Sequence, residues 1–142
     1  MIKKLLILAS LSLSLILTSC VLTKGDATNE DEVKDDGMIT YEQISQAVAK
    51  SLMDSETDYV IIDARTEAEY AEGHIEGAIL IPEYEIKDRA EEIIKDKDTL
   101  ILVYCRSGRR SKIAAEELAL LGYTRVKEFG GIIDWEYGTV TE

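Results

Sequence analysis

The chain contains few of the side chains that bind soft metals. Its 142 residues include one histidine and two cysteines, whereas a structural zinc site takes about four cysteine or histidine ligands. Basic residues are scarce too: 16 lysines and arginines stand against 28 aspartates and glutamates, for a formal net charge of −12 at pH 7. A metal site is therefore not expected, and general electrostatic binding to nucleic acid or anionic lipid is excluded.

Long apolar runs are absent beyond the N-terminus. Lys3 and Lys4 precede a run from Leu5 to Leu17 that is apolar apart from small serines. It is too short for a membrane-spanning helix, which needs roughly 20 apolar residues. A charged start, an apolar core and small residues after it are typical of a secretory signal peptide. We predict that residues 1–19 form such a signal and are removed.

The residues around the predicted cleavage point indicate a membrane anchor. The sequence Leu-Thr-Ser-Cys at residues 17–20 resembles the lipobox of bacterial lipoproteins, which implies that Cys20 is lipidated and becomes the first mature residue. Stable anchoring needs more than one acyl chain, and a lipoprotein cysteine carries several. The predicted location is the cell envelope, on the extracytoplasmic side of a membrane. The alternative is an ordinary signal peptide with a coincidental cysteine.

The segment after the anchor is expected to be a flexible tether. Residues 20–37 are polar and acidic with almost no large apolar side chains, so they cannot bury enough surface to fold. Residues 38–142 then form one domain, near the usual size of about 100–150 residues.

Apolar runs alternate with helical patterns along this domain. Near-continuous apolar strands separated by helices predict the α/β class, with an open, mainly parallel sheet covered by helices on both faces. Two capping boxes, Thr40 with Gln43 and Thr66 with Glu69, mark helix starts. The predicted strands are 59–63, 78–81, 99–104 and 125–129, and the predicted helices are 40–53, 66–73, 86–95 and 111–121, with a last helical turn around Trp135.

Cys105 is the strongest candidate for a functional residue. It ends an apolar strand, and three of the chain's six arginines lie within residues 106–110, directly before a helix. Unpaired N–H groups and the positive dipole end at a helix start lower the pKa of a nearby thiol. We therefore expect a partly ionised nucleophile facing a small anion. The alternatives are an inert buried cysteine and a disulfide with Cys20, which the unstructured tether disfavours.

Two further polar residues follow a predicted strand. Asp63 and Arg65, like Cys105, lie at strand carboxyl ends. In an open parallel sheet the ligand crevice lies outside these ends. We expect the three residues to share one crevice, with Asp63 and Arg65 paired to brace it.

Several short motifs occur in order along the domain. The loop residues Tyr104–Ser111 form one of them, and the others are Asp63-Ala64-Arg65, Glu69-Tyr70, Gly73-His74-Ile75, Gly77-Ala78, Ile81-Pro82, Gly122-Tyr123, Val126, Gly130-Gly131-Ile132 and Trp135. Through these motifs and their spacing, residues 38–142 resemble a single rhodanese domain.

The resemblance implies a sulfurtransferase. The Cys105 thiolate would take the outer sulfur of thiosulfate or a similar donor and pass it, through a covalent persulfide, to a thiol or cyanide. No cofactor beyond that persulfide is implied. His74 would belong to a structural turn and support the site with Asp63 and Arg65. The predicted substrate-binding residues are Arg106, Ser107, Gly108, Arg109, Arg110 and Ser111; we expect one or two of the arginines to contact substrate.

Two other functions are possible for a cysteine loop of this kind. Tyrosine-phosphatase-type enzymes need an arginine six residues after the cysteine to clamp phosphate, and that position holds Ser111; rhodanese-like phosphatases also have a loop one residue longer. A phosphatase is therefore disfavoured. The remaining alternative is a non-catalytic rhodanese module that binds an anion or senses oxidation through Cys105.

Overall fold

The computed structural model describes residues 41–141. The predicted signal peptide (1–19), Cys20 and the tether (20–37) lie outside the described residues. Within them, no helix is long and apolar enough to cross a membrane. The elements are β1 (Glu42–Gln43), α1 (Gln46–Ser55), β2 (Tyr59–Asp63), α2 (Glu67–Glu72), β3 (Ala78–Leu80), the 3₁₀ turn η1 (Glu83–Glu85), α3 (Ile86–Ile93), β4 (Leu100–Cys105), α4 (Arg109–Leu120), β5 (Arg125–Gly131) and the 3₁₀ turn η2 (Ile132–Asp134).

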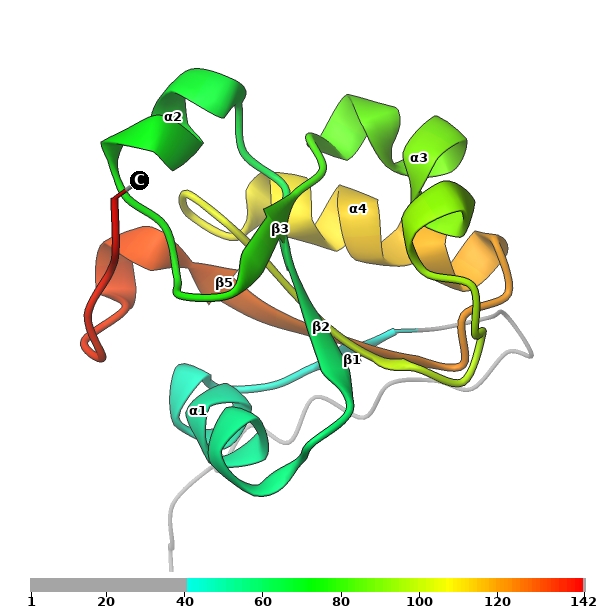
Figure 1. Cartoon of the computed structure of the whole chain (residues 1–142), viewed down its shortest axis with the longest axis horizontal. Helices are drawn as coiled ribbons and strands as arrows, with labels where there is room; N and C mark the ends of the chain where they lie inside the picture. The colour runs from blue at the N-terminus through cyan, green and yellow to red at the C-terminus, as the bar shows by residue number, and fades with distance from the viewer. Residues whose placement is uncertain (1–40, 142) are drawn as a thin grey trace, which may run out of the picture. The chain divides into compact units, whose positions relative to one another are not determined.

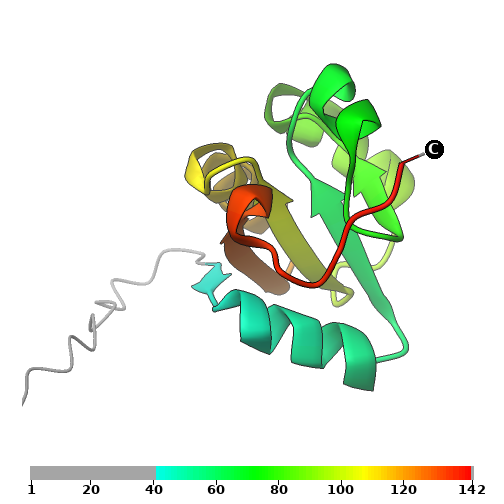
Figure 2. The ribbon, with the colours of Figure 1, turned by 90° about the vertical axis from the view of Figure 1, so that its left-hand side faces the viewer.

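The five strands form one sheet in the order β1-β5-β4-β2-β3. All four pairings are parallel, and helices lie on both faces (Figures 1 and 2). The predicted α/β class with an open parallel sheet is confirmed. β4 is the central strand, and all six of its residues are buried, as expected of a strand covered on both sides.

Alternate side chains of the strands enter two separate cores. One core packs α3 and α4 against one face and contains Ile62, Val103 and Cys105. The other lies under α1 and η2 and contains Ile61 and Tyr104. Successive strand side chains point to opposite faces, so the two last residues of β4 belong to different cores.

Two predicted helix starts differ from the structure. Thr40 lies outside the described residues, and within them the first helix begins later than predicted: residues 42–43 form the edge strand β1, and α1 begins at Gln46, with the Ser45 hydroxyl accepting from the Val48 N–H. β1 is exposed and only two residues long, so no hydrophobic pattern marks it. α4 begins at Arg109 rather than Ser111, because Gly108 provides the N-cap. The Thr66–Glu69 capping box is confirmed.

A buried polar cluster joins β2 to β4. Arg65 Nη2 donates to Asp63 Oδ2 over 2.7 Å, and the Tyr104 hydroxyl donates to the same oxygen over 2.6 Å. Arg65 also donates to the Gly73 carbonyl, and the Tyr104 oxygen accepts from the Ile75 N–H. The predicted Asp63–Arg65 ion pair is confirmed, and both of its side chains are buried.

Replacing Asp63 by alanine should destabilise the protein by about 3–5 kcal/mol, because Arg65 would remain buried without its counter-charge. Equilibrium urea unfolding measures the change. The matched control is Asp54→Ala, which removes a carboxylate from an exposed pair with Lys50 and should cost less than about 1 kcal/mol. Equal costs for the two variants would contradict a stabilising role for the buried cluster.

Candidate active site

Cys105 lies at the carboxyl end of the central strand, at the start of the loop that leads into α4. Its residue is only 1% exposed, and the Gly108 N–H points at the sulfur, with an N···Sγ distance of 3.1 Å. Gly108 has φ of +95°, a left-handed conformation that glycine adopts without strain. This turn brings backbone N–H groups around the sulfur, as the sequence predicted.

Hydrogen bonds to the sulfur lower the pKa of the Cys105 thiol. Burial is the largest single influence and raises the pKa, because it disfavours the charged thiolate. The Ser111 hydroxyl and the backbone N–H groups of Ser111, Ser107 and Gly108 together outweigh it. The predicted direction is confirmed, but uncharged hydrogen-bond donors are the leading cause rather than arginine charge.

The three arginines of the loop region have different surroundings. Arg110 donates to both oxygens of Glu69, each over 2.7 Å, so its guanidinium is held against α2. Arg106 and Arg109 are exposed. Their guanidinium groups are therefore the ones open to a dissolved anion, whereas Arg110 is committed to an ion pair.

The segment Gly130–Gly131 closes the back of the loop. A Cβ atom on Gly131 would lie 2.3 Å from the Arg106 carbonyl oxygen and 2.6 Å from the Ser107 Cα. Only glycine therefore lets β5 approach the loop this closely. The Arg106 carbonyl also accepts from the Ile133 N–H over 3.3 Å, which ties the loop to η2.

The expectation that Asp63 and Arg65 share a crevice with Cys105 is wrong. Asp63 bonds to Tyr104, and Tyr104 and Cys105 point into opposite cores. The prediction that Asp63 and Cys105 end their strands is correct. Side chains alternate along a strand, however, so Asp63 lies with Tyr104 on one face of the sheet and Cys105 lies on the other. The Asp63–Arg65 pair therefore braces β4 from behind the reactive sulfur.

His74 also lies away from the sulfur. Its ring stacks on Tyr70, with ring centroids 3.7 Å apart. Its backbone N–H and carbonyl bond to Val140 over 2.9 and 2.8 Å. These contacts fit the structural role that the sequence suggested, because they join the turn before β3 to the C-terminal segment.

Glu128 is the residue that sequence reasoning missed. It is 3% exposed, and its Oε1 accepts from the Ser111 hydroxyl over 2.6 Å and from the Gly130 N–H over 2.8 Å. It carries no motif, but it alternates with buried Val126 along β5. That spacing of two places Glu128 on the same inward face and could have singled it out.

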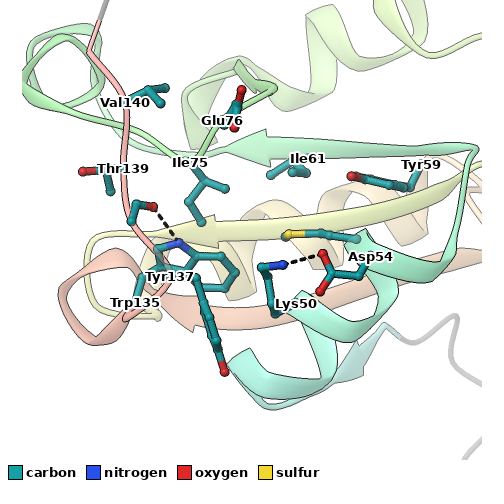
Figure 3. A pocket seen from close by; sticks show the side chains of 12 residues that line it. Lys50, Asp54, Tyr59, Ile61, Ile75, Glu76, Trp135, Tyr137, Thr139 and Val140 are labelled. Atoms are coloured by element: carbon teal, nitrogen blue, oxygen red, sulfur yellow. Dashed lines mark hydrogen bonds and ion pairs between the residues drawn. The ribbon is translucent and has the colours of Figure 1, made fainter.

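A separate cavity of about 400 Å³ lies on the other side of the sheet (Figure 3). Trp135 and Tyr137 border it opposite Ile61 and Ile75. Neither Cys105 nor its loop lines this cavity, so it is distinct from the sulfur site. Among residues 41–141, no cluster of histidine, cysteine or acidic side chains is arranged to hold a metal ion.

Comparison with known proteins agrees with this geometry. Residues 45–137 match the rhodanese-like domain, and the chain belongs to that family. It is 42% identical over 73 residues to the thiosulfate sulfurtransferase PspE of Escherichia coli K12, covering 51% of this chain and 70% of the relative. It is 44% identical over 92 residues to a sulfurtransferase of Allochromatium vinosum, covering 64% and 83%.

Solved structures show the same fold. A rhodanese with anions from E. coli superposes with a TM-score of 0.56 at 38% identity, over 59% of this chain and 99% of that one. A rhodanese-like domain protein from Staphylococcus aureus gives a TM-score of 0.63 at 28% identity, over 71% and 98%.

The Glu69–Arg110 pair beside the loop should make stability depend on pH. The hydrogen bonds from Arg110 are the main reason that the pKa of Glu69 falls from 4.5 to about 2. A carboxyl group whose pKa is lowered by folding stabilises the protein above its unfolded pKa and loses that effect as the pH falls through the folded pKa.

Replacing Glu69 by glutamine should therefore cost about 1 kcal/mol at neutral pH, since glutamine keeps the capping box but not the charge. Urea unfolding of both proteins should show this difference shrinking as the pH falls from 4.5 toward about 2. A difference that is independent of pH would show that the ion pair is not its source.

Proposed function

We propose that this chain is a sulfurtransferase that carries sulfur on Cys105. The Cys105 thiolate attacks the outer sulfur of thiosulfate, a new S–S bond forms, and sulfite leaves with the electron pair of the old one. The observation that carries the proposal is the Cys105 sulfur inside a ring of hydrogen-bond donors that lower its pKa. Such donors are suited to an anionic sulfur both before and after the transfer.

The second half of the reaction returns the enzyme to its starting state. A thiolate or cyanide attacks the outer sulfur of the persulfide, the S–S bond breaks, and Cys105 leaves as a thiolate. The Gly108 N–H and the other loop donors already stabilise that leaving group. A leaving thiolate with a lowered pKa departs faster, so one set of donors serves both halves.

Thiosulfate is the proposed donor for two reasons. PspE of E. coli and GlpE of Coxiella burnetii, the latter 33% identical over 97 residues, are named thiosulfate sulfurtransferases. In this chain, Arg106 directly follows Cys105 and Arg109 begins α4, and both are exposed, so they would attract a small dianion. The acceptor in the proposal is a thiol or cyanide.

The second candidate function is a carrier or sensor that accepts sulfur or an oxidant once. One relative, YrkF of Bacillus subtilis, is named a putative sulfur carrier protein; it is 35% identical over 94 residues, and the match spans half of its length. Repeated turnover distinguishes the two, because a sensor would not pass sulfur on to a small acceptor.

Incubation of the reduced protein with thiosulfate should add one sulfur atom, seen as an intact-mass increase, and cyanide should remove it. Cys105→Ser should not gain the sulfur, because its hydroxyl is too weak a nucleophile. Thiocyanate released over many cycles measures turnover. A single charging event without turnover would favour the carrier; no mass gain in folded protein would reject thiosulfate as the donor.

We further propose that the protein is exported and anchored by lipid on Cys20. The apolar run of residues 5–17 and the lipobox-like residues 17–20 support this. The acidic segment that follows would let the domain work at a distance from the membrane surface.

Cells that express the full chain should incorporate labelled palmitate into it, and Cys20→Ser should abolish the label because it removes the acylated thiol. Cys105→Ser is the matched control and should keep the label. Labelling of the Cys20 variant, or no labelling of the unaltered chain, would reject the anchor.

A further inference from the structure

Glu128 is a buried carboxylate without a cationic partner in the described part of the chain. Its residue is 3% exposed, and its hydrogen bonds come from a serine hydroxyl and a backbone N–H. Buried carboxylates in proteins are normally paired with a cation or bound to a metal. A buried carboxylate that has no cationic partner and contacts the first turn of α4 therefore needs a chemical explanation.

The Ser111 hydroxyl connects Glu128 to the sulfur. Ser111 is fully buried in the first turn of α4. Its oxygen lies 2.6 Å from Glu128 Oε1, 3.1 Å from the Gly108 carbonyl oxygen and 3.4 Å from the Gly130 carbonyl oxygen. Ser111 and Cys105 are also joined through Gly108, whose carbonyl accepts from the Ser111 hydroxyl and whose N–H donates to the sulfur. A Ser111 proton turned toward the sulfur lowers the pKa of the Cys105 thiol.

A serine hydroxyl has only one proton to donate. The sulfur, the carboxylate and two carbonyl oxygens therefore compete for it. Hydrogen bonds to an ionised acceptor are shorter and about twice as strong as neutral ones, and the Glu128 contact is the shortest of the three that the Ser111 hydroxyl makes to oxygen atoms. The Ser111 hydroxyl therefore donates to the Glu128 carboxylate most of the time and to the Cys105 sulfur less often.

We propose that Glu128 is a positioning residue that acts through Ser111: it holds the serine proton away from Cys105 and so limits how much of the cysteine is thiolate. This rests on the proposed sulfur transfer, because it sets how readily Cys105 takes up sulfur. A smaller thiolate fraction also slows oxidation of the cysteine.

Other charged groups near the loop act in a different way. Arg110 of α4 is held by Glu69 of α2, and its charge interacts electrostatically with Cys105 and with Glu83 of η1. None of these has a described hydrogen bond to Ser111. Among the charged groups of the described residues, only Glu128 hydrogen-bonds the Ser111 hydroxyl, so its effect can be separated from general electrostatics.

Glu128→Gln is the decisive substitution. The glutamine carbonyl can take the place of Oε1 and still accept from both the Gly130 N–H and the Ser111 hydroxyl. As a neutral acceptor it holds the serine proton about half as strongly as the carboxylate does, so the sulfur receives that proton more often. The rate of Cys105 alkylation by iodoacetamide, followed across pH, measures the thiolate fraction. Below the thiol pKa we expect about a tenfold faster reaction, the effect of one hydrogen bond to a charged group.

A double substitution tests whether Glu128 acts on Cys105 through the Ser111 hydroxyl. In a Ser111→Ala background, Glu128→Gln should change the alkylation rate by less than about twofold, since no hydroxyl remains to redirect. Glu116→Gln, which removes an exposed negative charge from α4, is the charge-matched control and should leave the rate unchanged. A slower or unchanged rate in Glu128→Gln, or an equal gain without Ser111, would overturn the proposal.

A second variant covers the case in which Glu128→Gln does not fold. Glu128→Asp keeps the charge but shortens the side chain, so the carboxylate withdraws from Ser111. The proposal expects faster alkylation of Cys105 in this variant too. A purely electrostatic effect predicts no change, so an unchanged rate would reject the proposal. Alkylation needs no sulfur donor, so these outcomes stand even if thiosulfate fails to charge Cys105, which would reject only the proposed function.

Discussion

The pairing of Asp63 with Tyr104 is the constraint on which the site depends. Tyr104 is held from one face of the sheet by the Asp63–Arg65 pair, and the next residue, Cys105, points to the other face. Because consecutive strand residues alternate, fixing the ring of Tyr104 also fixes the direction of the Cys105 sulfur. β4 is the central strand, with β2 and β5 paired on its two sides, so the strand end cannot shift to relieve either contact.

Local patterns predicted much of the fold and of the site. The apolar strand that ends at Cys105, the short polar loop and the helix after it are contiguous in the sequence, so they could be predicted. The Thr66–Glu69 capping box is also local, and it too was predicted correctly. β1 was missed because its two exposed residues form a strand only by pairing with β5, 85 positions along the chain. The face on which Asp63 lies was missed for a similar reason, since it depends on the register with Tyr104.

Charge was the least predictable part of the site. The sequence groups three arginines after Cys105, and this predicts a common positive patch. Folding pairs Arg110 with Glu69, 41 positions away, while its charge still interacts with Cys105. Folding also brings the carboxylate of Glu128 against Ser111 at the start of α4. Spacing along the chain reports which charges are neighbours in sequence, but ion pairs of this kind arise only when distant elements pack.

An acidic protein can stabilise a sulfur anion because the donors at Cys105 are mostly uncharged. Backbone N–H groups act at hydrogen-bond range and are already aimed at the sulfur, so little reorganisation is needed when charge develops. Exposed charges, in contrast, are screened beyond about 8–10 Å by salt. The formal charge of −12 is then compatible with anion chemistry. In such a site each donor counts, and one carboxylate that competes for the Ser111 proton matters more than the many acidic side chains on the surface.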